Sequence, residues 1–151
     1  MSHQGIEIPP RKRPVDDKGY FEELTKAVFR AGFSWRVIHD KWPHFRVAFD
    51  DFDIQVIASY DEIDLDRLLS DPGIVRNGRK IEATVYNAQV MQEITFEHGS
   101  FFEYLRSLDD LSYAQRRQIL CDLFHSVGPT SVFVFLHNVN EGVPSWEERH
   151  T

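Results

Sequence analysis

A short segment near the C-terminal end of the chain, residues 125–131, has residue types that can bind a phosphate group. Gly128 can take the left-handed conformation that closes a tight turn between two helices, and Pro129 presets the first turn of the second helix. That helix would present free backbone N–H groups and the positive end of its dipole, with the hydroxyls of Thr130 and Ser131 as further donors. Such a turn could hold a DNA backbone, although a plain connection between two helices accounts for the same residues equally well.

A second segment, Ala31-Gly-Phe-Ser-Trp35, predicts a turn that ends in a serine helix cap with an aromatic residue on each side. Trp35 would lie in the first turn of the following helix, where its ring could stack on an extruded base or attract a cationic one. A tryptophan that simply fills the core is the alternative at this position.

A third segment, residues 71–80, combines a turn with a cluster of cations near the beginning of a long predicted helix. Arg76, Arg79 and Lys80 lie at the helix end where positive charge opposes the helix dipole. A phosphate partner would explain these cations better than local stability does, and a solvated basic patch is the alternative.

The sequence offers little for other kinds of chemistry. Its seven histidines are scattered without an HxxxH pair or a His/Cys cluster, so no metal site is expected. It contains no GxSxG, Walker or GxGxxG motif, and no cofactor is implied. The single cysteine, Cys121, follows the apolar periodicity of a predicted helix and is expected in the core.

The helical spacing of apolar residues predicts the elements that position these segments. The first helix runs to about Arg30, the second from Ser34 to Pro43, and a third begins at Pro43. The longest helix spans about 77–98 and the last about 129–139, where the Gly-Pro-Thr-Ser start favours a helix over a strand. Capping residues are expected at Asp16 or Asp17, Ser34, Asp53, Asp61, Ser100 and Ser112, the last two in reciprocal capping boxes.

No segment alternates apolar and polar residues as a strand would. The predicted fold class is therefore all-α, a compact bundle of about eight or nine short helices, with one helical domain over residues 16–140. Residues 1–15 hold three prolines and a basic run and are expected to form a solvated tail, with a DNA-seeking arm as the alternative. Residues 141–151 are expected to form a polar C-terminal tail.

The net charge of the chain limits the kinds of partner that it can bind tightly. The 151 residues include 17 lysines and arginines against 24 aspartates and glutamates, a net charge of −7, which argues against tight nonspecific DNA binding. However, the acidic residues concentrate in 50–66 and 141–148, while the segment 76–80 is basic. The net charge is therefore compatible with a DNA-binding face of modest, salt-sensitive affinity. Because the chain has one cysteine and no apolar run long enough for a membrane, we expect a cytoplasmic protein.

Taken in order, AGFSW, DPGIVRNGRKIEATVYNA and VGPTSVFVFL resemble the DNA-3-methyladenine glycosylase type I family, a branch of the helix-hairpin-helix DNA glycosylases. The resemblance extends over about residues 16–139. It implies an all-helical fold in which the VGPT turn is the hairpin that holds DNA and the AGFSW segment faces the damaged base. The family hydrolyses the N-glycosidic bond of N3-methylated adenine in DNA and leaves an abasic site without cutting the strand.

The resemblance also implies a set of site residues. The implied base pocket consists of Trp35, Ala27 and Tyr20. The implied DNA contacts are Phe33, Arg76, Asn77, Lys80, Gly128, Pro129, Thr130 and Ser131.

The sequence departs from the family in two places. Members carry a pocket glutamate eight residues before the tryptophan, where this chain has Ala27; Glu23, one helical turn earlier on the same face, is the candidate replacement. Members also hold a zinc ion with two cysteines and two histidines, where this chain has Ser145 and Arg149 in the C-terminal pair. The N-terminal aromatic motif of the family is absent as well, which leaves Tyr20 as a partial substitute.

Two main hypotheses follow. The first is a monofunctional DNA glycosylase of base excision repair that acts on alkylated purine, chiefly 3-methyladenine, in double-stranded DNA. The second is a catalytically degenerate protein of the same fold that binds lesions or DNA without cleaving the base, motivated by Ala27. A helical interaction domain that binds no DNA is a third possibility.

Overall fold

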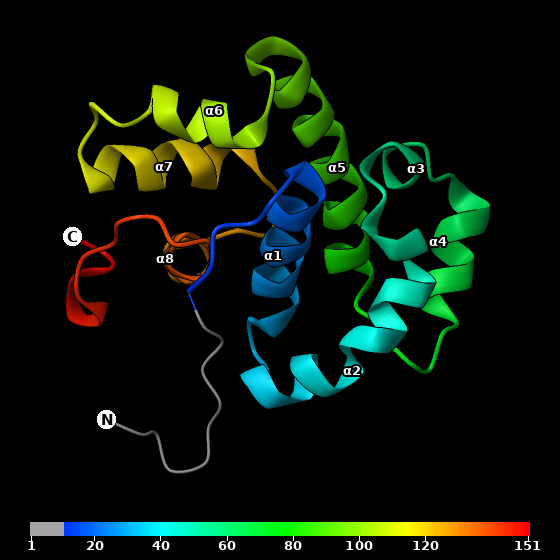
Figure 1. Ribbon diagram of the computed structural model, residues 1–151. Coiled ribbons are helices and arrows are strands. Elements are labelled where there is room, and N and C mark those ends of the chain that lie inside the picture. The colour runs from blue at the N-terminus through cyan, green and yellow to red at the C-terminus, as the bar shows by residue number, and fades with distance from the viewer. Residues whose placement is uncertain (1–10) are drawn as a thin grey trace.

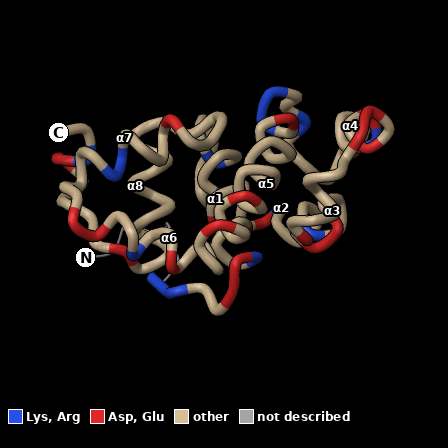
Figure 2. The backbone as a smooth tube through the Cα atoms, turned by 90° about the horizontal axis from the view of Figure 1, so that it is seen from above, with Lys and Arg blue, Asp and Glu red and all other residues tan. Residues whose placement is uncertain are grey.

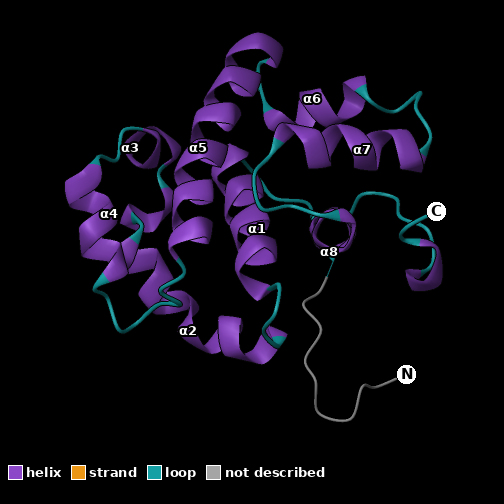
Figure 3. Cartoon of the chain, turned by 180° about the vertical axis from the view of Figure 1, so that it is seen from behind, coloured by secondary structure: helices purple, strands orange, loops and turns teal. Residues whose placement is uncertain are grey.

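The computed structural model describes residues 11–151, and within them it is entirely helical (Figure 1; Figure 3). The predicted all-α fold is confirmed. The α-helices are α1 (Asp17–Arg30), α2 (Trp35–Ala48), α3 (Ile54–Ala58), α4 (Glu62–Leu69), α5 (Gly78–His98), α6 (Phe101–Ser107), α7 (Tyr113–Leu123) and α8 (Pro129–Asn138). Two 3-10 turns, η1 (Asp50–Phe52) and η2 (Trp146–Glu148), complete the described part.

Helix α1 is the centre of the bundle, because it contacts α2, α5, α6 and α8. Figure 1 shows it between α5 and α8, with α3 and α4 beyond α5 and α7 close to α8. Its buried side chains include Phe21, Leu24 and Val28, each no more than 1% exposed. Packing around α1 therefore fixes the segments that carry the predicted site residues. These are the C-terminal end of α1, the starts of α2 and α5, and the α7–α8 turn.

Most helix starts agree with the predicted caps. A side-chain oxygen accepts a backbone N–H at the beginning of each of these helices: Asp16, Ser34, Asp53, Asp61, Ser100 and Ser112. Ser112 forms the predicted reciprocal capping box with Gln115. At Ser100 the structure shows one of the two bonds of such a box, from the Glu103 N–H to the Ser100 hydroxyl. These caps depend on residues only two or three positions apart, which is why the local sequence predicts them.

The predicted break at Pro43 is wrong, because α2 continues through this residue to Ala48. Proline removes one backbone hydrogen-bond donor from a helix. Here, however, the residues before and after Pro43 keep their contacts with the core. Trp42 and Phe45 stack with ring centroids 4.9 Å apart, and Ile38, Phe45 and Ala48 are buried. These contacts across the proline position outweigh the lost hydrogen bond.

Both chain ends pack on the bundle to a greater extent than expected. Within the predicted N-terminal tail, Arg11 Nε donates to the His137 carbonyl (2.9 Å) and the Arg13 guanidinium lies 3.7 Å from the Phe102 ring centroid. In the predicted C-terminal tail, Arg117 Nη1 donates to the Thr151 carbonyl (2.9 Å). Residues 11–15 and 141–151 therefore belong to the folded unit; residues 1–10 lie outside the described residues.

The charge distribution matches the pattern in the sequence. Figure 2 shows acidic positions along α4, and the segment 76–80 that leads into α5 carries Arg76, Arg79 and Lys80. Over residues 11–151, none of the helices combines the length and the apolarity that a membrane span needs.

Candidate nucleic-acid interface and base site

The α7–α8 connection reverses direction at Ser126 rather than at Gly128. Ser126 has a left-handed φ of +59°, whereas Gly128 is extended, with φ −101° and ψ −175°. The predicted left-handed role of Gly128 is therefore wrong. Gly128 is the N-cap of α8, a position that requires extended dihedrals, so the reversal has to occur earlier in the turn.

Helix α8 begins with open space in front of its first turn. Pro129 occupies the first helical position as predicted, no side chain caps the helix, and the first helical bond runs from the Val132 N–H to the Gly128 carbonyl (2.9 Å). A Cβ atom on Gly128 would meet no protein atom within 4 Å. Protein packing therefore does not require glycine here, but close approach of a phosphate to the helix end would.

The two hydroxyls predicted as phosphate donors differ in their surroundings. Thr130 Oγ1 lies 3.3 Å from His150 Nε2 and accepts from Arg149 Nε (3.4 Å), so the C-terminal segment brings polar and cationic groups to this turn. Ser131 is buried, with 7% of its surface exposed, which leaves little of its hydroxyl for a ligand. The structure supports Thr130 more than Ser131 as a side chain at the surface.

Sequence reasoning missed Asn87, the residue that holds the turn in place. Asn87 Nδ2 donates to the His125 carbonyl (3.2 Å), and the His125 N–H donates to Asn87 Oδ1 (2.8 Å). Asn87 is 1% exposed, so its amide depends on partners within the protein, and these two bonds provide them. A polar residue within the buried face of the long helix was the signal that could have revealed it.

The start of α5 presents two free cations and one that is engaged. Asn77 caps the helix, accepting from the Lys80 N–H (3.1 Å). Arg76 and Arg79 are exposed and form no ion pair with any residue in 11–151. These two guanidinium groups are available to a phosphate.

Lys80 has a different role from the predicted DNA contact. Its Nζ donates to the carbonyls of Ala31 (2.5 Å) and Phe29 (3.3 Å), at the C-terminal end of α1. Partial burial lowers the pKa of the Lys80 ammonium. A cation at a helix C-terminus satisfies carbonyls that have no partner within the helix. Lys80 therefore fixes the turn after α1 and is not free to bind a phosphate.

That turn has the predicted form. Gly32 has a left-handed φ of +88°, Ser34 accepts from the Val37 N–H (3.3 Å), and Trp35 is the first residue of α2. Phe33 is 42% exposed, and Lys80 Nζ lies 5.5 Å from the centroid of its ring. The exposed phenyl ring and the half-buried indole ring of Trp35 therefore lie together at the tip of α1.

The structure buries the side chains of the other two predicted pocket residues, Tyr20 and Ala27. Tyr20 lies near the N-terminal end of α1, whereas the α1–α2 turn with Trp35 follows the C-terminal end of that helix. Tyr20 is 1% exposed, and its ring centroid lies 5.2 Å from that of Phe101. Burial raises the pKa of its phenol. Ala27 is also 1% exposed and belongs to the hydrophobic core. Long-range packing of α1 against α6 and α8 draws both side chains inward.

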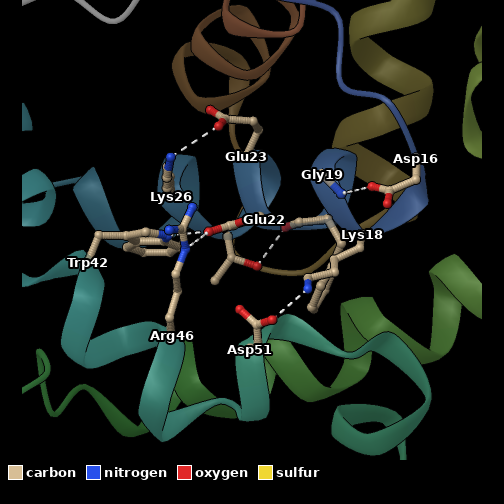
Figure 4. Close-up of polar contacts among 11 residues, drawn as sticks. Asp16, Lys18, Gly19, Glu22, Glu23, Lys26, Trp42, Arg46 and Asp51 are labelled. Atoms are coloured by element: carbon tan, nitrogen blue, oxygen red, sulfur yellow. Dashed lines mark hydrogen bonds and ion pairs between the residues drawn. The ribbon is translucent and has the colours of Figure 1, made fainter.

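The carboxylate nearest in sequence to the lost pocket glutamate is already paired. Glu23 Oε2 accepts from Lys26 Nζ at 3.1 Å, and both side chains are less than a quarter exposed (Figure 4). Lys26 Nζ also lies 5.9 Å from the Trp35 ring centroid and 5.4 Å from that of Trp42. The chain thus places its own cation, together with its counter-charge, beside the aromatic ring predicted to receive a base.

Glu22, the other acidic residue in this region, supports α2. Its Oε2 accepts from Trp42 Nε1 and from Arg46 Nε, both at 2.6 Å (Figure 4). With two donors on one oxygen, Glu22 fixes the angle between α1 and α2 and is not available for a substrate.

The C-terminal residues do not fit the zinc site of the family. Ser145 Oγ donates to Glu148 Oε1 (2.9 Å), and the Arg149 guanidinium lies 3.7 Å from the Trp146 ring centroid. A guanidinium cannot ligate zinc. Across residues 11–151 no group of three His, Cys, Asp or Glu side chains could hold a metal ion.

Comparison with known proteins shows which family the chain resembles. The family model described as methyladenine glycosylase matches residues 12–123. The chain is 32% identical over 93 residues to DNA-3-methyladenine glycosylase 1 of Escherichia coli, a match that covers 62% of this chain and 50% of the relative. It is 33% identical over 78 residues to DNA-3-methyladenine glycosylase of Haemophilus influenzae, covering 52% of this chain and 42% of that protein. The chain thus spans about half the length of these relatives.

The fold has close counterparts among solved structures. The crystal structure of 3-methyladenine DNA glycosylase I from Staphylococcus aureus superposes with a TM-score of 0.76 and 30% identity, covering 85% of this chain and 78% of the other. A mutant of 3-methyladenine DNA glycosylase I in complex with 3-methyladenine superposes equally well, with a TM-score of 0.76 and 79% of its length covered. Because the family model matches well over half of the sequence and the folds coincide, the chain belongs to the methyladenine glycosylase family.

Proposed function

We propose that this protein is a monofunctional DNA glycosylase that hydrolyses the N-glycosidic bond of an alkylated purine, chiefly 3-methyladenine, in double-stranded DNA. The observation that carries the proposal is the open N-terminus of α8 in a fold of this family. Its N–H groups are uncapped, Gly128 leaves space in front of them, and Asn87 fixes the preceding turn. In this proposal the helical domain, residues 16–140 together with the packed segments 11–15 and 141–151, acts on DNA in the cytoplasm.

The reaction needs little acid or base catalysis from the protein. Methylation at N3 makes adenine cationic, so the base leaves with the electrons of the glycosidic bond and becomes neutral, while water adds to the sugar carbon and loses a proton. The protein has to extrude the nucleotide, stack the base and admit water. In this proposal Trp35 supplies the stacking face, and Phe33, 42% exposed beside it, contacts the gap left in the duplex.

Glu23 is the proposed carboxylate for the base or the attacking water. Its partner Lys26 neutralises it in the free protein. An incoming cationic base would compete with the ammonium of Lys26 for both Glu23 and the aromatic faces. This competition predicts weaker base binding than an unpaired carboxylate would give, because part of the interaction free energy is used to displace Lys26.

The test is release of free base from methylated duplex DNA, followed by chromatography of the ethanol-soluble fraction. We expect release by the wild-type protein and loss of release by Gly128→Val, whose side chain would block the approach of a phosphate to α8. Because a Cβ at Gly128 meets no protein atom, this variant should keep its fold. No release above background with protein in excess would refute glycosylase activity.

A lesion-binding protein without catalysis is the second candidate. Two observations favour it: Glu23 is paired with Lys26, and the position of the family's pocket glutamate is occupied by Ala27, which has no carboxylate. This candidate predicts binding to abasic-site DNA without release of methylated base. Ala27→Glu should then restore release, and Lys26→Met, which frees Glu23 without enlarging the buried position, provides a second variant in case Ala27→Glu does not fold.

A further inference from the structure

A groove of about 970 Å³ lies between α5 and the α7–α8 turn, beside the proposed phosphate site. Arg79, Glu82 and Tyr86 line it from one face of α5, at helical spacings of three and four residues. His125 and Gly128 line it from the turn. The groove is therefore continuous with the open end of α8.

Two aromatic rings are stacked in this groove. The rings of Tyr86 and His125 are 3.5 Å apart between centroids and inclined by only 5°. Tyr86 is 38% exposed and His125 is exposed as well, so the pair is not part of the core. Nor is it needed to hold the turn, because Asn87 already binds both backbone groups of His125. A parallel pair of exposed rings offers a flat surface on which a base can stack.

The charges in the groove favour a base over a phosphate. The guanidinium of Arg79 is the one fixed cation in its lining, and the carboxylates of Glu82 and Asp122 oppose it. Asp122 accepts a bond from Gln118 Nε2 (2.9 Å) through one oxygen, and Glu82 has no ion-pair partner within residues 11–151. Carboxylates repel phosphate but accept hydrogen bonds from the exocyclic amino group of a base, as they do with cytosine.

We propose that this groove binds one unpaired, amino-bearing base of the DNA strand whose phosphate is held at the N-terminus of α8. The base stacks on the Tyr86–His125 pair, and Glu82 accepts from its amino group. The inference rests on the proposed function for the position of the strand, and it adds a second nucleotide site distinct from the one at Trp35. It makes the protein selective for duplexes that contain an unpaired cytosine, adenine or guanine near the lesion.

The test uses duplexes with a stable abasic-site analogue and one unpaired 2-aminopurine, an amino-bearing fluorescent base, placed at successive positions around it. We expect wild-type protein to quench the fluorescence at one position, because stacking quenches 2-aminopurine. His125→Ala and Tyr86→Ala should lose the quenching and weaken binding to the unpaired duplex by about fivefold or more. Phe96→Ala, which removes a 90% exposed aromatic ring from the same helix, should change neither quantity.

His125→Ala keeps the hairpin intact, since Asn87 binds only its backbone, so loss of quenching by this variant reports on the ring. Replacing the unpaired cytosine by thymine, which has no amino group, should weaken binding, and Glu82→Gln should reduce that difference. Fluorescence anisotropy on a fully paired abasic-site duplex separates the two proposals. Failure to bind any duplex would refute the proposed function, whereas tight binding without quenching at any position would refute the nucleotide groove alone.

Discussion

The side-chain amide of Asn87, in the middle of α5, is bonded to both backbone polar groups of His125, in the α7–α8 turn. The two residues are 38 positions apart in the sequence. Through this pair the longest helix determines where the α7–α8 turn lies and therefore how the open end of α8 is presented.

Asn87→Ala removes two partly buried hydrogen bonds and leaves the His125 N–H and carbonyl without their side-chain partner. We expect the free energy of unfolding to fall by about 1–3 kcal/mol, as is usual when buried polar groups lose their partners, and DNA affinity to fall with it. Thermal denaturation and fluorescence anisotropy measure the two effects. Gln89→Ala is the matched control, because Gln89 lies on the same helix and bonds the Ala58 carbonyl (3.1 Å), away from the turn. Unchanged DNA affinity in a folded Asn87→Ala protein would contradict the role of the pair.

Lys80→Met should loosen the turn that carries Phe33 and Trp35. The substitution keeps the apolar stem of the lysine but removes the donor to the carbonyls of Phe29 and Ala31. We expect faster hydrogen exchange of the amides in 31–35 and a loss of about 1 kcal/mol in stability. Lys18→Met, which breaks an exposed ion pair with Asp51, should leave exchange in this turn unchanged. Equal exchange rates in the two variants would show that Lys80 does not cap α1.

Cys121 should react slowly with iodoacetamide at neutral pH. Burial raises the pKa of its thiol above the ordinary value of 9.0, and the thiolate is the nucleophile. The protonated thiol therefore dominates at pH 7–8, and the alkylation rate should rise about tenfold per pH unit until the raised pKa is reached. Mass spectrometry of the alkylated chain measures the rate, with the protein in urea as the reference. A folded-state rate equal to the unfolded-state rate at pH 8 would contradict this prediction.

The same thiol reports on the proposed groove, because Cys121 is one of its lining residues. DNA with an unpaired cytosine should slow alkylation of the folded protein further, and a fully paired duplex should do so less.

Arg76→Gln should reduce the salt dependence of DNA binding. If the exposed guanidinium contacts one phosphate, the slope of log K against log salt concentration should become shallower by about one unit. Binding should weaken by a similar factor on every sequence, because a phosphate contact carries no base information. Lys18→Gln, on the side of α1 that pairs with Asp51, should leave the slope as it is. An unchanged slope for Arg76→Gln would remove Arg76 from the interface.

Local chemistry explains which predictions from the sequence hold. The caps at Asp16, Ser34, Asp61 and Ser112 and the turn over residues 31–35 depend on residues a few positions apart, and the structure contains them. The break predicted at Pro43 also came from local chemistry, but it ignored the buried contacts on either side. Packing outweighs one missing hydrogen bond there, and no rule restricted to neighbouring residues includes that packing.

The sequence by itself determined most of the helices, their order and the family to which their motifs point, because apolar periodicity, capping and turn chemistry act within a single element. Only the tertiary structure decided what the polar side chains outside the helix caps do. Lys80 proved to cap α1, Tyr20 to be buried against α6, and Glu23 to be paired with Lys26. Each outcome depends on which elements lie next to each other, and the balance of charge, burial and hydrogen bonding at a side chain is defined only once those neighbours are in place.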